Sequence, residues 1–386
     1  MSMKKRRIQA YICTVFILSI IFSSFNGTAE AAPSVSAQKA IVIDQDTGRI
    51  LYEKDANTQS RIASITKIMT AILAIESGKL DETVKVSDNA VRAEGSSIYL
   101  KPGEKIKLED LVFGLMLRSG NDSAVAIAEH VGGSLDGFVY LMNKKAEEIG
   151  MKNTHFSNPH GLDDHEDHYS SAYDMAILTR YAMQNEKYRE VAGTKVHTSP
   201  DPENDWDRKW KNKNRLLTEL YKYCTGGKTG YTKRAKRTLV TTATKGGQNL
   251  IAVTLNGPDD WNDHIQMFEY GFKNFDTVIA VSEGKVDDIK DPFYENKIYI
   301  KRDVLLALKK EEIETVRVEY KLLKPKESWK DAVVPEVVGK AVIYMGGEQA
   351  DAVPLYYSQV KVKEKKSWWM FWKQSFITVL GVKTDG

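Results

Sequence analysis

Three short groups of polar residues in this chain have types and spacings that suit acyl-transfer chemistry. The first is Ser64-Ile65-Thr66-Lys67, which opens a segment whose apolar residues recur at three- and four-residue steps, as on the buried face of a helix. Ser64 and Lys67 should therefore lie on one side of that helix, a turn apart. A serine hydroxyl needs a base to act as a nucleophile, and lysine is a base only where a desolvated or cation-rich site keeps it neutral. Alone, the pair also fits an ordinary helix cap followed by a solvated lysine.

The second and third groups lie between predicted regular elements. Ser119-Gly120-Asn121 separates two stretches patterned as buried helices, residues 108–117 and 123–130. Loops held by rigid elements often carry functional side chains, although serine and asparagine are also common helix caps. Lys228-Thr229-Gly230 precedes two strand-like runs, residues 238–243 and 250–255. This order predicts Lys228 on or beside a sheet edge, where glycine permits close backbone approach. The alternative for this group is a glycine-rich hairpin with an exposed lysine.

The remaining pattern predicts two folded parts. Residues 40–44 and 50–52 predict a β-hairpin before Ser64, and residues 138–149 and 171–183 predict further helices. From about residue 278, strand-like runs alternate with charged turns and contain no cluster of catalytic residue types. We therefore expect a catalytic domain over residues 32–277 and a small β domain over residues 278–360.

The two ends of the chain have targeting patterns. Lys4 to Arg7 are basic, an apolar stretch follows to residue 22, and Ala29-Glu30-Ala31 suits a signal peptidase. This predicts a signal peptide over residues 1–31, with an uncleaved signal anchor as the alternative. Lysines and three tryptophans within residues 361–380 predict an amphipathic helix, too short and too charged to span a bilayer, that lies on an anionic membrane surface. The alternative for this tail (residues 361–386) is docking on the chain's own β domain.

Composition gives further limits. The 386 residues are 42% hydrophobic and 28% charged, as in soluble globular proteins, and the net charge of +3 gives no reason to expect a nucleic-acid partner. The mature chain keeps only Cys224 and so cannot form an internal disulfide. Four of the seven histidines lie between residues 153 and 168, but their spacings match no short metal motif. We therefore expect no metal and no cofactor.

Taken together and in this order, the three groups resemble the motif set of penicillin-binding proteins and serine β-lactamases. With Gly120 in the middle group, the chain is most similar to the low-molecular-weight penicillin-binding proteins that act as serine-type D-alanyl-D-alanine carboxypeptidases. The resemblance extends over the opening hairpin, residues 158–163, the β domain and the tail. Residues 223–232 are similar to those of the sporulation-specific carboxypeptidases of spore-forming bacilli. Most relatives have Asp-Gly and an aliphatic residue before the Lys-Thr-Gly, where this chain has Thr225-Gly226-Gly227.

The resemblance implies a fold and a set of roles. The fold would be the α/β (α+β) penicillin-binding/serine β-lactamase-like transpeptidase fold, an antiparallel sheet flanked by helices, plus a small all-β C-terminal domain. By the resemblance, the catalytic residues are Ser64 as acyl-ester nucleophile, Lys67 as proton acceptor, Ser119 as proton shuttle and Asn121, which orients Lys67 and the substrate amide. Lys228, Thr229, Gly230 and Lys213 would bind substrate, and backbone N–H groups of Ser64 and of the strand after Gly230 would form the oxyanion hole.

The resemblance also implies substrates and a location. The expected substrates are peptidoglycan stem peptides ending in D-Ala-D-Ala, whose trimming limits cross-linking, in the spore cortex by the closer likeness. β-Lactams are expected as covalent inhibitors. The enzyme would be secreted and held by its tail on the extracytoplasmic face of the cell membrane, or on the outer forespore membrane in a sporulating cell.

Three questions stay open in the sequence. A β-lactamase would need a water-activating carboxylate near the acylated serine, and residues 163–167 offer acids. A penicillin-binding sensor would be acylated without turnover. Cys224 lies four residues before Lys228, so strand alternation could turn its thiol toward the cleft, whereas the alternative is a buried, inert thiol.

Overall fold

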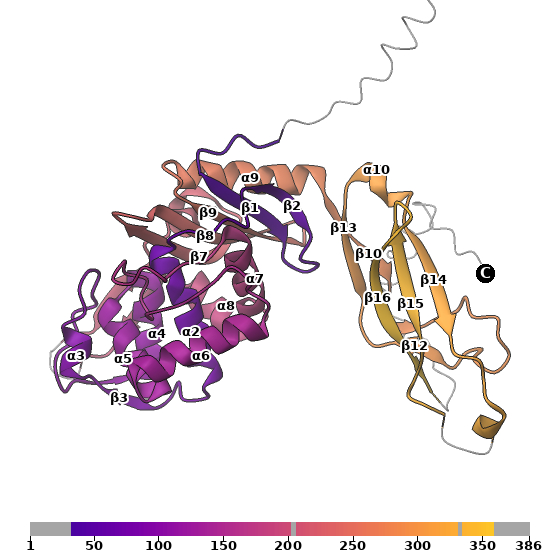
Figure 1. Ribbon diagram of the computed structural model, residues 1–386, viewed down its shortest axis with the longest axis horizontal. Coiled ribbons are helices and arrows are strands. Elements are labelled where there is room, and N and C mark those ends of the chain that lie inside the picture. Colours follow the sequence, from indigo (N-terminus) through magenta and orange to yellow (C-terminus); the bar gives the residue numbers. More distant parts are fainter. Residues whose placement is uncertain (1–31, 202–205, 331–333, 359–386) are drawn as a thin grey trace, which may run out of the picture. The chain divides into compact units, whose positions relative to one another are not determined.

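A computed structural model describes residues 32–201, 206–330 and 334–358 (Figure 1). The predicted signal peptide and the predicted tail helix lie outside the described residues. The first folded part is organised by a five-stranded antiparallel sheet in the order β2-β1-β9-β8-β7. Its strands are β1 (Lys39–Asp44), β2 (Ile50–Lys54), β7 (Cys224–Thr232), β8 (Lys236–Lys245) and β9 (Gln248–Leu255). The predicted hairpin and the two predicted strands after Lys228 are confirmed, and β7 forms one edge of the sheet.

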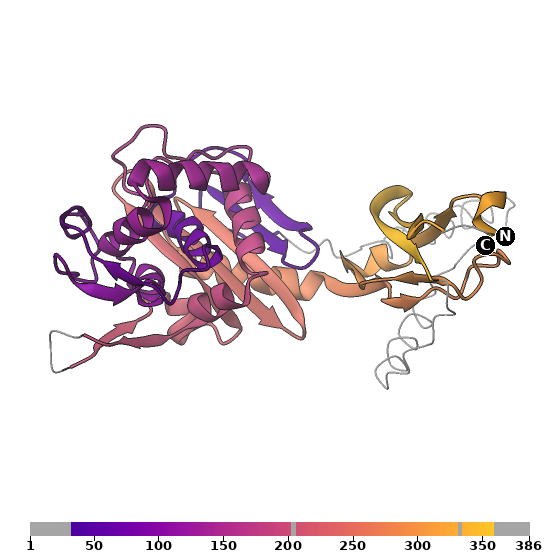
Figure 2. The same ribbon diagram turned by 90° about the horizontal axis from the view of Figure 1, so that it is seen from below.

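Strand alternation sends successive side chains of this sheet into two different apolar layers. Ile41 and Ile43 pack in the cluster that contains helix α2, whereas Ala40 and Val42 pack in the cluster that contains Phe268 of α9. Figures 1 and 2 show α9 along one face of the sheet and the other large helices on the opposite face. These helices are α2 (Lys67–Glu76), α4 (Leu108–Phe113), α5 (Asn121–Gly132), α6 (Leu135–Glu148), α7 (Ala172–Ala182), α8 (Glu186–Gly193) and α9 (Asp260–Asn274).

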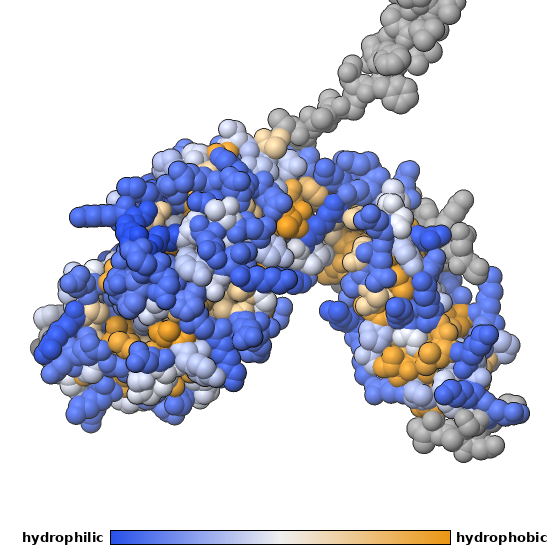
Figure 3. Space-filling view, in the orientation of Figure 1, coloured by the Kyte–Doolittle hydropathy of each residue, from blue (hydrophilic) through white to orange (hydrophobic). Residues whose placement is uncertain are grey.

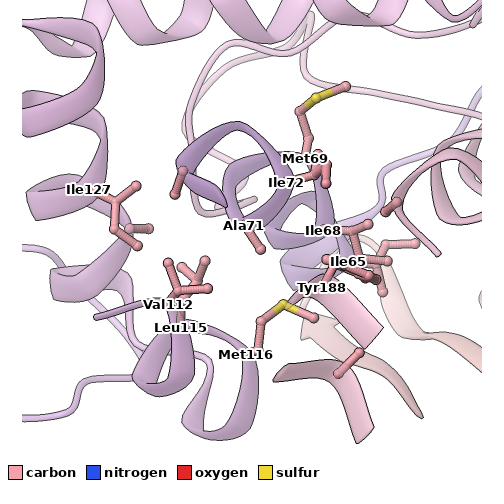
Figure 4. Close-up of a cluster of buried hydrophobic side chains, with 14 of the residues drawn as sticks. Ile65, Ile68, Met69, Ala71, Ile72, Val112, Leu115, Met116, Ile127 and Tyr188 are labelled. Atoms are coloured by element: carbon pink, nitrogen blue, oxygen red, sulfur yellow. The ribbon is translucent and has the colours of Figure 1, made fainter. Parts of the chain in front are cut away.

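Helix α2 is buried on every side rather than along one stripe. Its neighbours include Val112, Leu115 and Ile127 from α4, η2 and α5 (Figure 4). The sequence places the start of this helix at Ser64, but the α-helix begins at Lys67 and is preceded by a 3₁₀ turn, η1 (Ala63–Thr66). Residues three apart eclipse each other in a 3₁₀ turn, so this difference brings Lys67 over Ser64 more directly than an α-helix would.

Shorter elements complete the helical side. They are β3 (Thr83–Lys85), α3 (Asp88–Val91), β4 (Lys105–Lys107), the π-helical turns η2 (Gly114–Arg118) and η3 (Leu216–Leu220), β5 (Val196–Ser199) and β6 (Arg208–Lys211). The predicted helix over residues 108–117 is α4 followed by η2, which ends at Ser119 in the left-handed conformation. Figure 2 shows the β5–β6 hairpin projecting from the helical layer.

The second folded part is a β domain with its own apolar core. Its elements are β10 (Asp276–Val281), β11 (Gly284–Lys285), β12 (Ile298–Ile300), β13 (Val304–Leu308), α10 (Lys310–Ile313), β14 (Arg317–Leu322), the 3₁₀ turn η4 (Glu327–Lys330), β15 (Val337–Met345) and β16 (Glu348–Tyr357). β10 pairs with β13, and the other five strands of this domain form a sheet in the order β11-β12-β16-β15-β14. In the view of Figure 3, hydrophilic residues cover most of the visible surface of both folded parts. Among the described residues, no helix has the length and apolarity needed to cross a bilayer.

Candidate active site

The site is built around the amine of Lys67. Its Nζ lies 3.1 Å from Ser64 Oγ, 2.7 Å from Asn121 Oδ1 and 2.7 Å from the backbone carbonyl of His160. Asn121 presents its oxygen to the amine because its Nδ2 donates to the carbonyl of Glu94. A neutral amine has two N–H groups and one lone pair. The Asn121 and His160 oxygens can only accept, so they take the two N–H groups, and the lone pair is left facing the Ser64 hydroxyl.

Burial and neighbouring cations favour the neutral form of this amine. Complete burial is the largest cause that lowers the pKa of Lys67 well below its ordinary value of 10.5, and the charges of Lys228 and Lys213 add to the effect. The carboxylate of Asp122 acts in the opposite direction. Burial, and then the charge of Lys213, also lower the pKa of Lys228 to about 7. The local environment therefore favours the neutral form of lysine that the Ser64–Lys67 spacing requires.

Strand β7 forms the wall of the site beside Ser64. A Cβ added to Gly230 would lie 2.9 Å from the backbone nitrogen of Ser64, so the close approach of strand and nucleophile needs glycine at this position. Lys228 is only 2% exposed, and its Nζ donates a 2.7 Å hydrogen bond to the Thr229 carbonyl. The predicted edge position of Lys228 is confirmed, and the alternative of an exposed lysine is wrong.

Two other predicted site residues, Ser119 and Lys213, lie outside the regular helices and strands. Ser119 is buried and has φ of +65°, and Asn121 begins helix α5 two residues later. Lys213 follows β6, and its Nζ lies 3.4 Å from Ser96 Oγ. The structure therefore brings Ser64, Lys67 and Asn121 into direct contact and places Lys228 and Lys213 close enough to act on the charge of Lys67.

Sequence reasoning missed several residues that support the site. His160 contributes only its backbone carbonyl, a role without a side-chain signature. Asp122 directly follows the second motif, and its carboxylate accepts hydrogen bonds from Ser97 Oγ and from the backbone N–H groups of Ile98 and Leu100. It thereby anchors the loop whose Glu94 carbonyl orients Asn121. The signal available for Asp122 was its adjacency to the motif.

Three of the acids in residues 163–167 are bonded to other side chains. Asp164 accepts a hydrogen bond from Asn158, and Asp167 accepts one from Ser157. Glu166 pairs with Arg61 and Arg234 at the surface. No group of three or more His, Cys, Asp or Glu side chains placed to hold a metal ion is found among the described residues.

Cys224 lies in the apolar cluster beside α9, and burial raises the pKa of its thiol to about 11. Simple strand alternation does not relate Cys224 to Lys228, because a β-bulge interrupts the β7–β8 register between Cys224 and Gly226. The buried-thiol alternative is the one that the structure has.

Comparison with known proteins identifies the family. Residues 26–259 match the family described as D-alanyl-D-alanine carboxypeptidase, and residues 275–363 match the C-terminal domain of penicillin-binding protein 5. The chain belongs to the D-alanyl-D-alanine carboxypeptidase family. The carboxypeptidase is 38% identical over 285 residues to D-alanyl-D-alanine carboxypeptidase DacF of Bacillus subtilis, which covers 71% of this chain and 72% of the relative. It is 29% identical over 387 residues to DacA of Escherichia coli, with 92% of each chain covered.

Solved structures agree with this assignment. Penicillin-binding protein 5 of Haemophilus influenzae superposes on the carboxypeptidase with a TM-score of 0.69 and 28% identity, covering 87% of this chain and 100% of that one. The penicillin-binding/β-lactamase-like fold and its C-terminal β domain, predicted from the sequence, are confirmed. The carboxypeptidase is therefore a serine-type peptidase with D-alanyl-D-alanine carboxypeptidase activity.

Proposed function

We propose that the carboxypeptidase removes the terminal D-alanine from peptidoglycan stem peptides through an acyl-enzyme on Ser64. The observation that carries this proposal is the amine of Lys67. It is fully buried, has its two N–H groups taken by Asn121 and His160, and lies 3.1 Å from the Ser64 hydroxyl. A serine with a neutral base at this distance is an activated nucleophile.

The proposed reaction assigns steps to Ser64, Lys67 and Ser119. Ser64 Oγ attacks the carbonyl carbon between the two D-alanines while its proton passes to Lys67 Nζ. That proton then reaches the leaving D-alanine amine through Ser119, and the C–N bond breaks. Water attacks the acyl ester, loses its proton to the same base, and releases the shortened peptide and the Ser64 hydroxyl.

Binding and charge stabilisation come from the walls of the cleft. The ammonium of Lys228, the hydroxyl of Thr229 and the ammonium of Lys213 would hold the terminal carboxylate of the peptide. The N–H groups of Ser64 and Tyr231 would bind the oxyanion, and the glycine at position 230 lets the two backbones approach. Each such donor typically lowers the barrier by about 3–4 kcal/mol.

The same chemistry supports acylation by β-lactams. Attack of Ser64 on the lactam carbonyl opens the ring, and the leaving nitrogen stays attached to the acyl group. Asp164, Glu166 and Asp167 are bonded elsewhere, so they favour slow release of this adduct over β-lactamase turnover. The sensor alternative differs from the proposal only in the absence of peptide turnover.

One experiment distinguishes a carboxypeptidase from a β-lactamase and from a penicillin-binding sensor. The full chain, purified in detergent, is incubated with benzylpenicillin and separately with a peptide ending in D-Ala-D-Ala, and both mixtures are analysed by mass spectrometry. We expect a long-lived penicilloyl adduct on Ser64 and release of D-alanine from the peptide. Fast loss of the adduct with penicillin turnover would indicate a β-lactamase, a stable adduct without peptide cleavage would indicate a sensor, and no adduct would refute the proposal.

We further propose that the enzyme is secreted and works at the extracytoplasmic membrane surface in sporulating cells. The basic and apolar start of the chain supports secretion, and the lysines and tryptophans of residues 361–380 support peripheral binding to anionic lipid. The likeness of residues 223–232 to sporulation-specific carboxypeptidases supports a role in the spore cortex. Co-sedimentation with anionic and neutral vesicles tests the membrane proposal. Muropeptide analysis of spore cortex from cells without the enzyme tests the sporulation proposal.

A further inference from the structure

The residue before the nucleophile has a backbone conformation that its side chain disfavours. Ala63 has φ of +50°, in the left-handed region, and is only 1% exposed. That conformation typically costs a residue other than glycine about 1–2 kcal/mol, and it persists only where the surroundings fix it. The groups that fix Ala63 bear on catalysis, because its carbonyl and the Ser64 N–H belong to the same planar peptide.

Contacts from three separate segments hold the backbone at this point. Thr66 Oγ1 donates a 2.8 Å hydrogen bond to the Ala63 carbonyl. Gly161 lies against the same oxygen so closely that an added Cβ would be 1.9 Å from it. One residue earlier, Thr238 Oγ1 of β8 donates a 2.9 Å hydrogen bond to the carbonyl of Ile62. The peptide that carries the Ser64 N–H therefore has little freedom to rotate.

The orientation of the Thr66 hydroxyl is set by the buried His168. The hydroxyl has one proton, and this proton goes to the Ala63 carbonyl, which can only accept. His168 Nε2, 2.9 Å from Thr66 Oγ1, must then be the donor in their contact. The other ring nitrogen leads to the same tautomer, because His168 Nδ1 accepts a 3.0 Å hydrogen bond from the Ser157 N–H. Burial also lowers the pKa of His168 to about 4, so the ring is neutral at physiological pH.

We propose that Thr66 and His168 are positioning residues that aim and polarise the Ser64 N–H in the oxyanion hole. A chain of three hydrogen bonds runs in one direction, from the Ser157 N–H through His168 and Thr66 to the Ala63 oxygen. Hydrogen bonds in such a chain polarise one another, so the last peptide becomes a better N–H donor on its opposite side. This inference rests on the proposed function in one respect, namely that the Ser64 N–H binds the oxyanion.

Two matched pairs of variants test the role. Thr66→Val keeps the size and removes the hydroxyl, whereas Thr66→Ser keeps the hydroxyl. His168→Phe removes the ring nitrogens, whereas His168→Gln keeps an N–H donor near the position of Nε2. The full chain with each substitution is assayed for kcat and KM on a D-Ala-D-Ala peptide and for the rates of acylation and deacylation with benzylpenicillin.

We expect Thr66→Val and His168→Phe to lower kcat and both penicillin rates by about 10- to 100-fold with little change in KM, since loss of an entire oxyanion donor costs about 10²–10³. Thr66→Ser and His168→Gln should recover most of that loss. Folded Thr66→Val with parental kcat, or equal impairment of Thr66→Val and Thr66→Ser, would overturn the inference. If Thr66→Val does not fold, the His168 pair decides by the same criterion. An unaltered chain that forms no acyl-enzyme would instead count against the proposed function.

Discussion

Replacing Lys228 by methionine should make the protein more stable at neutral pH while it removes a substrate-binding cation. Burial lowers the pKa of this lysine from 10.5 to about 7. At about 1.36 kcal/mol for each pKa unit, this lowered pKa reduces the free energy of unfolding by about 4–5 kcal/mol at pH 7 and below. Methionine removes this penalty but leaves the Thr229 carbonyl, the 2.7 Å partner of the ammonium, without its donor. That loss costs about 1–3 kcal/mol, so the net gain should be about 1–4 kcal/mol.

The stability gained by Lys228→Met should decrease as pH rises. The folded-state pKa of Lys228 lies below the unfolded value, so the unfolded chain binds more protons between pH 7 and 10.5 and the penalty fades across that window. The melting temperature of Lys228→Met, followed by circular dichroism from pH 6 to 10, should exceed that of the parent by several degrees at pH 7, at about 2–4 °C per kcal/mol. The difference should vanish or reverse toward pH 10.

Lys233→Met, in the exposed turn between β7 and β8, is the control and should show no such pH-dependent gain. A Lys228→Met protein that is less stable than the parent at pH 7, or a difference that does not change with pH, would refute this reasoning. Loss of peptide turnover in the same variant would then show that stability and function conflict at this position.

Three further outcomes follow from the same geometry. In the free enzyme, Lys228 loses its charge as pH rises through about 7, so kcat/KM for a substrate with a free carboxylate should fall above that pH. Lys228→Arg should shift this fall to higher pH, and a kcat/KM that stays constant to pH 9 would contradict a carboxylate-binding role for Lys228. Gly161→Ala should abolish acylation because its Cβ would lie 1.9 Å from the Ala63 oxygen, whereas Gly150→Ala, with a similar positive φ and nothing within 4 Å, should lose about 1 kcal/mol of stability and keep full activity in the same penicillin assay. The Cys224 thiol, with a pKa raised to about 11, should resist a disulfide reagent in the folded protein, and rapid labelling with loss of acylation would show that it faces the cleft.

Much of the fold was predictable because local periodicity reflects burial. Alternating residues in β1, β8 and β9 face two different apolar layers, and the three-to-four spacing after Ser64 indicates a helix, although α2 is buried on all sides and not on one face. The family resemblance of the three motifs implied that Asn121 orients Lys67, and the two residues form a hydrogen bond across 54 positions of sequence. Each motif alone also fits an ordinary turn or helix cap, and only their order in the chain supports the family resemblance.

Other parts of the site depend on backbone conformation, which residue types indicate poorly. Nothing in the letters around Ala63 signals a positive φ, because alanine is usually right-handed. His160 acts through a carbonyl, and Gly161 through the side chain that it lacks. The histidine spacings of residues 153–168 matched no metal motif and indicated no other role, yet His168 is buried and its ring contacts the Thr66 hydroxyl. The alternation argument for Cys224 failed because one bulge reverses every face that follows it.

The order of the causes that lower the pKa of Lys67 has a consequence for turnover. A substrate carboxylate that binds Lys228 and Lys213 cancels part of their charge, and this change alone would raise the pKa of Lys67 and protonate the base when it is needed. Burial is the larger cause, however, and it does not depend on the substrate. It is produced by the apolar packing around α2, where Ile65 and Ile68 are fully buried (Figure 4). The core therefore favours the neutral amine each time Lys67 must accept a proton, and packing defects beside Lys67 that admit water should reduce kcat without touching any group that contacts the peptide.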